Sequence, residues 1–205
     1  MKRIGLTVGL LVLTICSAIG APDVHILVAY HSDTGHTKAM AEAVGTGAKQ
    51  VEGVTVAVAH IRNITTDMLL KADAIILGSP VINGNVHPKV LAFINRWPFQ
   101  NNPMQDKIGA AFTTGGGFSS GEEHVMHSIH NAMLIHNMIV AGGADWRSAF
   151  GASAVVSEKP YFTEDEKGKV SKYFLEKGRS LGKRIAVLAL KLKCIQKKAT
   201  PAVKQ

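Results

Sequence analysis

Strand-like and helix-like segments alternate along this chain from Val24 onward, and no other feature of the sequence limits the fold as strongly. The run Val24–Tyr30 is continuously apolar, which is typical of a strand covered on both faces, and the segment that follows carries its apolar residues on one helical face. The predicted strands are 24–30, 54–60, 74–78, 108–114 and 138–141, and the predicted helices are 37–49, 87–96, 122–136 and 163–192. This order predicts an α/β fold, with helices on both faces of an open parallel sheet, in one domain.

The formal net charge of +8 is concentrated at the two ends of the chain. Lys2 and Arg3 precede the first acidic residue, and residues 191–205 contain five lysines and no acid. Residues 22–190 carry 16 Lys or Arg and 15 Asp or Glu, so the body is near neutral and does not indicate a nucleic-acid partner. We therefore predict a folded domain over 21–190 and a basic, disordered tail over 191–205, which can make weak contact with an anionic membrane surface.

Residues 1–20 have the layout of a secretory signal peptide. Lys2 and Arg3 form a positive start, residues 4–15 are apolar, and small residues such as Ala18 and Gly20 fit a cleavage site after Gly20. The sequence therefore predicts an exported protein, secreted or periplasmic. The alternative is a protein anchored to the membrane by an uncleaved N-terminal segment.

The first of three loops after predicted strands has the chemistry of a phosphate site. Ligands in open parallel sheets bind beyond the carboxyl ends of the strands. Here Ser32, Thr34 and Thr37 supply hydroxyls, Gly35 supplies a flexible backbone, and the next helix supplies free N–H groups. The loop lacks the Gly-Lys-Ser/Thr of a P-loop, so it suggests a phosphorylated cofactor that is held rather than a nucleotide that is cleaved.

The second and third loops are rich in residues that allow exposed or tightly turned backbone. Residues 78–85 contain Pro80 and Gly84, which suits a backbone lying against a flat ring. Residues 113–121 contain the run Gly115-Gly116-Gly117, which lets the main chain approach a ligand closely. Together the three loops predict a cofactor site at one edge of the sheet.

These loops, with Ile135-His136-Asn137-Met138, resemble the flavodoxin-like fold. The likeness is strongest to NAD(P)H:quinone oxidoreductases of the tryptophan-repressor-binding-protein type, and more broadly to NADPH-dependent FMN reductases, over about residues 24–192. The resemblance implies a three-layer sandwich with a five-stranded parallel sheet of order 2-1-3-4-5. It also implies an FMN-dependent enzyme that transfers a hydride from NADH or NADPH to a quinone-like acceptor, and it is compatible with a homo-oligomer.

The resemblance also implies roles for individual residues. The residues expected to hold the FMN phosphate are Ser32, Thr34, Gly35, His36 and Thr37; those expected around the flavin ring and ribityl chain are Val81, Ile82, Asn83, Thr114, Gly115, Gly116, Gly117 and Phe118. His136 is expected beside the flavin as the catalytic residue, and Trp97 on the substrate side.

Two other functions remain open from the sequence: a one-electron carrier of the flavodoxin type, and a flavodoxin-like binding protein without catalysis. Flavodoxins generally present an acidic face, and the near-neutral body counts against the carrier. No metal site is predicted. His124, His127 and His130 recur at every third position, but no carboxylate or cysteine is placed to complete a ligand set, so a polar helix face is expected.

Overall fold

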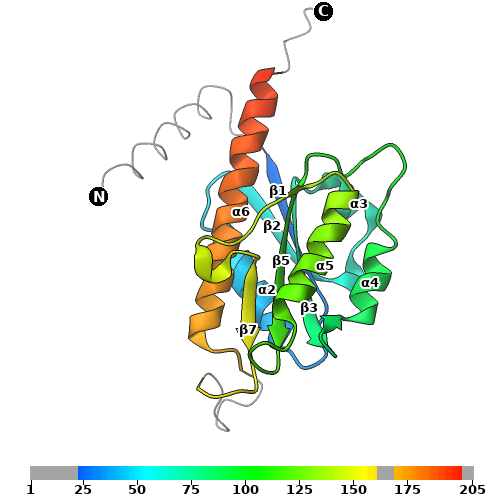
Figure 1. The fold of residues 1–205 in the computed structure, drawn as a ribbon. Coiled ribbons are helices and arrows are strands. Elements are labelled where there is room, and N and C mark those ends of the chain that lie inside the picture. The colour runs from blue at the N-terminus through cyan, green and yellow to red at the C-terminus, as the bar shows by residue number, and fades with distance from the viewer. Residues whose placement is uncertain (1–22, 161–168, 200–205) are drawn as a thin grey trace, which may run out of the picture.

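The structure is a computed structural model that describes residues 23–160 and 169–199. It is a three-layer sandwich in which helices cover both faces of a central sheet (Figure 1). The strands are β1 (Val24–Tyr30), β2 (Val54–His60), β3 (Ala74–Ile82), β4 (Asn85–Val86), β5 (Ile108–Gly115), β6 (Ile139–Val140) and β7 (Ala152–Val155). The helices are α2 (His36–Ala48), α3 (Thr66–Lys71), α4 (Pro88–Ile94), α5 (Glu122–Ile135) and α6 (Lys172–Ala199), with short 3-10 helices η1 (Ile61–Asn63) and η2 (Trp146–Ser148).

The sheet confirms the predicted flavodoxin-like fold and corrects its strand count. Its strands run in the order β2-β1-β3-β5-β6, and these are the five predicted strands in the order 2-1-3-4-5. All four pairings along this path are parallel. The described residues contain seven strands rather than five; the two additional strands, β4 and β7, were not predicted.

The outer side of β5 is paired by two separate segments. β6 pairs with its beginning, Ile108 and Gly109, and β7 pairs with its end, from Phe112 to Gly115. The predicted fifth strand is therefore only the first half of an edge that the chain completes after leaving the sheet and returning. β7 is a run of only four small and apolar residues, too short to show a periodicity.

β4 closes a hairpin with the end of β3. Val81 pairs with Val86 and Ile82 with Asn85, and the turn between them has positive φ at Asn83 (49°) and Gly84 (73°). Positive φ at both central residues defines a type I′ turn, which Asn-Gly strongly favours. The dipeptide was thus a hairpin signal in the sequence.

The core has one part on each face of the sheet. The side chains of β1 alternate between the two: Ile26 and Val28 pack with α2 and α6, and Leu27 and Ala29 pack with α3, α4 and α5. Both faces are covered, which is why β1 is apolar throughout.

α2 and α6 approach each other at glycines. A Cβ added to Gly182 would lie 1.9 Å from the carbonyl oxygen of Val44, so no larger residue fits between the two backbones.

Several helix boundaries differ from expectation. The predicted start of the last helix at Thr163 lies outside the described residues, and α6 is described from Lys172. α6 continues to Ala199, so residues 191–199 are helical rather than disordered, and this end of the helix extends past the sheet (Figure 1). α3 was not predicted; Thr65 caps it by accepting a hydrogen bond from the N–H of Met68. None of the described helices is long and apolar enough to span a membrane.

Candidate functional site

Three loops meet at the carboxyl ends of β1, β3 and β5. We call them loop 1 (31–35), loop 2 (83–87, with β4) and loop 3 (116–121), and we call their common position the loop edge. The strands are neighbours in register, with Tyr30 opposite Gly78 and Gly78 opposite Phe112, so the loops leave the sheet side by side. The backbones of loops 2 and 3 touch, since a Cβ on Gly121 would lie 2.7 Å from the Cα of Gly84.

The N-terminus of α2 points its main-chain donors into the loop edge. Gly35 precedes the helix with φ of 92°, and within the described chain no side chain caps α2 and no acid lies in its first turn. The loop is shaped by its own contacts: the N–H of Gly35 donates to Ser32 Oγ at 3.0 Å, and Thr34 Oγ1 lies 2.8 Å from His36 Nδ1. Uncapped N–H groups with the positive end of the helix dipole form a site for an anion.

A buried hydrogen bond ties α2 to the end of β5. Thr37 Oγ1 and Thr114 Oγ1 lie 2.8 Å apart, and both residues are buried. This bond holds the start of α2 against the first glycine of the 115–117 run. The predicted phosphate residues and the predicted glycine residues are therefore brought together.

Loop 2 begins beside a serine that organises three backbone segments. Ser79 Oγ donates to the carbonyl of Pro80 at 2.8 Å and accepts from the N–H of His87 at 3.0 Å, and Thr113 Oγ1 donates to the carbonyl of Ser79 at 2.7 Å. Beyond it, Ile82 is 41% exposed at the end of β3, next to the turn residue Asn83. The predicted ring-lining residues of this loop therefore lie at the loop edge, with an apolar side chain open to solvent.

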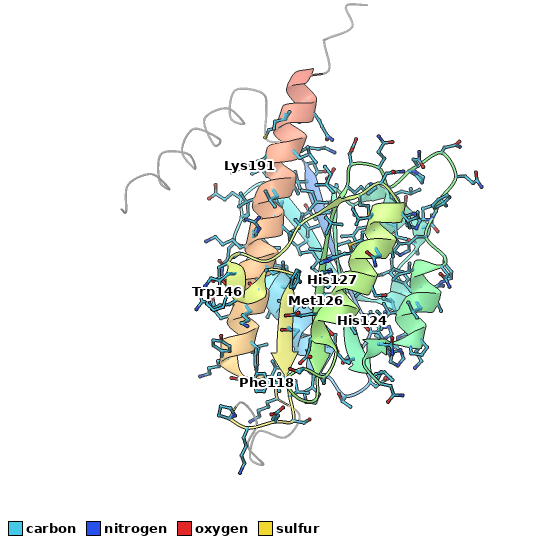
Figure 2. The ribbon with its side chains drawn as sticks, viewed as in Figure 1. Phe118, His124, Met126, His127, Trp146 and Lys191 are labelled. Carbon is cyan, nitrogen blue, oxygen red and sulfur yellow. The ribbon has the colours of Figure 1, made fainter. Side chains whose placement is uncertain are left out.

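In loop 3 the backbone has free space beside it at Gly116 and is held by Glu158 at Gly117 and Phe118. A Cβ on Gly116 would meet no atom of the described residues within 4 Å, whereas one on Gly117 would lie 2.6 Å from Glu158 Oε2. The same carboxylate accepts the N–H of Phe118 at 2.7 Å. Phe118, at the loop end of the molecule in Figure 2, is 48% exposed and borders a cavity of about 500 Å³ that reaches β7 and α6.

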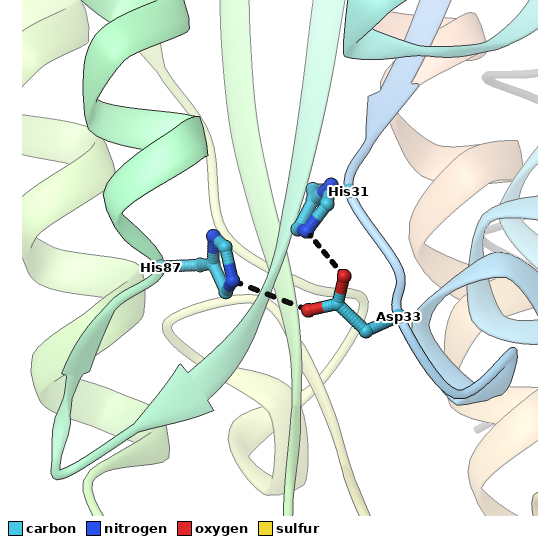
Figure 3. A group of neighbouring side chains, drawn as sticks. All are labelled: His31, Asp33 and His87. Atoms are coloured by element: carbon cyan, nitrogen blue, oxygen red, sulfur yellow. Dashed lines mark ion pairs between the residues drawn. The ribbon is translucent and has the colours of Figure 1, made fainter.

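A cluster of side chains joins loop 1 to loop 2: His31, Asp33 and His87, shown in Figure 3, with His60 of β2 beside His31. Asp33 Oδ1 lies 3.1 Å from His31 Nε2, and Asp33 Oδ2 lies 3.2 Å from His87 Nε2. His31 Nδ1 lies 3.0 Å from His60 Nε2.

Burial lowers the pKa of both His60 and His87 and so favours the neutral form of each ring. Burial acts to raise the pKa of Asp33, but the combined effect of His31, Lys89 and His87 is larger and lowers it. The pKa therefore lies below its usual value, and the side chain is ionised. The sequence did not predict this cluster, because its members come from three separate segments of the chain. Only His31 and Asp33 lie in the same predicted loop.

Comparison with known proteins agrees with this geometry. Residues 22–152 match the NADPH-dependent FMN reductases as a family. The chain belongs to this family. A flavodoxin of Aquifex aeolicus is 32% identical over 169 residues, which cover 78% of this chain and 84% of the relative. An NAD(P)H dehydrogenase (quinone) of Geotalea daltonii is 28% identical over 205 residues, covering 82% and 97%.

Solved structures show the same fold. The crystal structure of a WrbA-like flavodoxin from Agrobacterium tumefaciens superposes with a TM-score of 0.64 at 26% identity, covering 81% of this chain and 97% of the other. A flavodoxin from the domain Archaea gives a TM-score of 0.62 at 27% identity, covering 81% and 99%. Like the rest of its family, the chain is an FMN-binding oxidoreductase.

The loop edge of this FMN reductase fits its cofactor. Two helices begin there, and they differ: Glu122 Oε2 accepts the N–H of Ser120 at 2.9 Å and so occupies the start of α5, whereas α2 has no such acid in the described chain. A phosphate dianion therefore suits α2. Ser120 Oγ is buried without a hydrogen-bond partner among the described residues, and the hydroxyls of a ribityl chain can satisfy it.

Two of the residues predicted for the FMN site of this reductase lie away from the loop edge. α5 starts at the loop edge and runs back along β5, so its 14 residues carry the chain about 20 Å away at 1.5 Å per residue. His136 follows its last turn and packs against Trp97, with ring centroids 5.5 Å apart, and against Phe99 at 5.2 Å. Within one chain the structure therefore brings His136 and Trp97 together at the opposite edge of the sheet, away from the loop edge, and their expected places beside the flavin and the substrate stay predictions.

Proposed function

We propose that this FMN-binding oxidoreductase takes a hydride from NADH or NADPH and passes it to a quinone-like acceptor at the loop edge. The observation that carries the proposal is the uncapped start of α2 held against the glycine run of β5 by the Thr37–Thr114 hydrogen bond. The donor and acceptor are supported by relatives from Geotalea daltonii and Rhizobium meliloti that are described as NAD(P)H dehydrogenases (quinone).

Bound FMN supplies the redox chemistry, and the chain supplies binding, orientation and electrostatics. The N–H groups at the start of α2 and the hydroxyl of Thr37 would hold the phosphate. The open backbone at Gly116 would lie against the cofactor, and the exposed apolar side chains of Ile82 and Phe118 would exclude water from the ring. No acid or base from the chain is needed for hydride transfer itself.

The decisive experiment is an absorbance spectrum of the purified chain with FMN, recorded before and after anaerobic addition of NADH or NADPH. We expect a bound flavin spectrum that bleaches on addition of one of the two nucleotides and recovers on addition of a quinone. A colourless protein that takes up no FMN would instead favour the non-catalytic binding protein.

The phosphate site is tested by Thr37→Val, which removes the hydroxyl and keeps the shape. Thr46→Val is the matched control, because Thr46 lies on the same helix but its exposed hydroxyl donates only to the carbonyl of Glu42. We expect the Kd for FMN to rise about tenfold or more for Thr37→Val, as for a lost hydrogen bond to a charged group, and to stay unchanged for Thr46→Val. Equal Kd values for the two variants would remove the support for this site.

A one-electron carrier is the second candidate, and the flavodoxin of Aquifex aeolicus favours it. A carrier is reduced in two separate one-electron steps and reacts slowly with NADH and NADPH. The enzyme is reduced by the nucleotide in a single two-electron step, so a potentiometric titration alongside the nucleotide reaction separates the two functions.

We also propose that the chain is exported, by a signal peptide over 1–20 or with an uncleaved segment as an anchor. Support for the proposal comes from the layout of that segment and from the position of the chain ends. β1 starts, and the basic end of α6 finishes, at the amino edge of the sheet, away from the loop edge (Figures 1 and 2). Lys193 Nζ binds Asp73 Oδ1 at 2.6 Å and anchors this part of α6 to the start of β3.

Cell fractionation tests the export, with a chain lacking residues 1–20 as the control that stays in the cytoplasm. Sedimentation with anionic and with neutral vesicles tests whether the basic end of α6 contacts a membrane surface. A homo-oligomer is part of the same proposal, and light scattering of the purified chain measures it.

A further inference from the structure

His31, Asp33 and His87 place three metal-ligating atoms within 4.8 Å of one another beside the loop edge (Figure 3). We propose that these three side chains bind one divalent transition-metal ion, with zinc as the type case, and leave at least one coordination position for water. Two imidazoles and one carboxylate form the set of ligands that such ions take in proteins. The ion would join the end of β1 to the start of α4.

The distances suit a common ion. Ligand atoms at 2.0–2.2 Å from zinc and separated by roughly 100° lie about 3.1–3.4 Å apart. Asp33 Oδ1 is 3.1 Å from His31 Nε2, and Asp33 Oδ2 is 3.2 Å from His87 Nε2, so each histidine faces its own carboxylate oxygen at this spacing. The ring centroids of His31 and His87 are 4.2 Å apart. The ligand atoms of the three residues lie within 4.8 Å of one another, so small side-chain shifts bring them around one ion.

The hydrogen bonding of the cluster leaves a buried atom unsatisfied. His31 is 3% exposed, and its Nε2 has no hydrogen-bond partner of suitable direction among the described residues, although Asp33 lies near it. A buried polar atom without a partner costs about 1–3 kcal/mol. Besides the arrangement of the three side chains, this unsatisfied buried nitrogen also indicates a ligand.

The positions of the protons explain why that atom is unsatisfied. The N–H of Arg62 donates to His60 Nδ1 at 3.1 Å, so neutral His60 carries its proton on Nε2 and donates it to His31 Nδ1. His31 Nδ1 then accepts this bond, which leaves Nε2 as the ring's donor atom, and Nε2 is the buried atom without a well-directed acceptor. In the same way, the N–H of Lys89 donates to His87 Nδ1 at 3.1 Å and keeps the proton of His87 on Nε2.

A bound metal ion would give the buried Nε2 of His31 a partner, and only donors at the surface would then lose theirs. With the ion on both Nε2 atoms, the protons of His31 and His87 shift to Nδ1, and His31 donates to His60 Nε2, as metal-bound histidines commonly donate to a neighbouring acceptor. The main-chain amides of Arg62 and Lys89 then lose their histidine acceptors. Both residues are exposed, so water replaces those two bonds. Asp33, at 52% exposed, leaves a path for the ion to enter.

Calorimetric titration of the untagged, FMN-loaded full chain with Zn²⁺ at pH 7.5 tests the proposal. We expect one ion per chain with a micromolar or lower Kd, and no heat with Mg²⁺, which avoids imidazole ligands. Asp33→Asn and His87→Gln should each raise the Kd for Zn²⁺ at least tenfold. His60→Gln removes only the contact that positions His31, so it should raise the Kd about tenfold and leave the stoichiometry unchanged. The matched control is His124→Gln, an exposed histidine on α5 outside the cluster, whose Kd should equal that of the parent chain.

Absence of heat in the parent chain would overturn the proposal, and so would equal Kd values for Asp33→Asn, His87→Gln and His124→Gln. The test does not need His31 variants, which remove a buried side chain and can unfold the protein. The site does not depend on FMN, so the FMN-free chain should bind Zn²⁺ with the same stoichiometry. A failed FMN assay and a failed zinc titration are therefore separate results.

Discussion

His130 lies in the middle of α5 and is the histidine whose protonation the fold resists most clearly. It is 7% exposed, and its Nε2 has no hydrogen-bond partner among the described residues. Burial, with a smaller contribution from His127, lowers the pKa of His130 from 6.5 to about 4. The folded protein must therefore keep this ring neutral at a pH where the unfolded chain protonates it.

The sign and size of the effect on stability follow from linkage. Because the folded pKa lies below the unfolded one, the contribution of His130 is fully present above pH 6.5 and is lost as the pH falls toward 4. With pKa values of 6.5 and about 4, the free energy of unfolding drops by about 2 kcal/mol between pH 7.5 and pH 5.0 from this residue alone. That is a shift of about 1 M in a urea midpoint at an m-value of about 2 kcal/mol per M.

His130→Leu tests the reasoning by urea unfolding at both pH values, followed by circular dichroism at a fixed FMN concentration. At pH 7.5 the variant should be as stable as the parent chain or more so, because an apolar side chain of similar size replaces a buried unpartnered nitrogen. Between pH 7.5 and 5.0 it should lose about 2 kcal/mol less than the parent chain. His124→Gln, on the exposed face of the same helix, should keep the full loss. An identical pH-dependent loss in His130→Leu and the parent would refute the assigned cause.

Substitutions at four glycines test the backbone geometry. Gly182→Ala should lower the free energy of unfolding by at least about 2 kcal/mol in urea, because its Cβ would lie 1.9 Å from the carbonyl of Val44; Gly178→Ala, whose Cβ finds contacts of 3.4 Å and longer, should be neutral or stabilising. Gly84→Ala should cost about 1–2 kcal/mol in a thermal melt, because φ of 73° disfavours a Cβ, while Asn83→Gly keeps the turn. Gly116→Ala should leave the Tm of the FMN-free chain unchanged, because its Cβ meets no described atom within 4 Å. It should raise the Kd for FMN, because the Cβ occupies space where the cofactor would lie. A lower Tm with an unchanged Kd would contradict this placement of the cofactor.

The parts of the fold that sequence could predict are those where burial alone determines the pattern. β1 is almost continuously apolar because both faces of the sheet are covered, and the alternation of such strands with helices predicted the parallel sheet correctly. β7 and α3 carried no comparable signal. β7 is defined by pairing with β5 across a segment that leaves the sheet, and α3 is a short helix that depends on its cap at Thr65.

The same distinction holds for the site. Loop 1, the end of β3 and the glycine run of β5 could be placed together because each follows a neighbouring parallel strand. His136 could not, since its place depends on the direction and length of α5, which carries it to the far edge. The cluster of His31, Asp33 and His87 depends on the type I′ turn at Asn83 and Gly84, which returns the chain so that His87 faces loop 1.

The divided outer side of β5 also bears on how the protein avoids aggregation. A long, flat, unpaired strand offers its amide and carbonyl groups to strands of other molecules and so seeds fibrils. On this side β6 presents only two residues and β7 only four, and the excursion between them breaks the continuity that an incoming strand would need. Replacing that excursion with a straight connection would create the uninterrupted template that the natural chain lacks here.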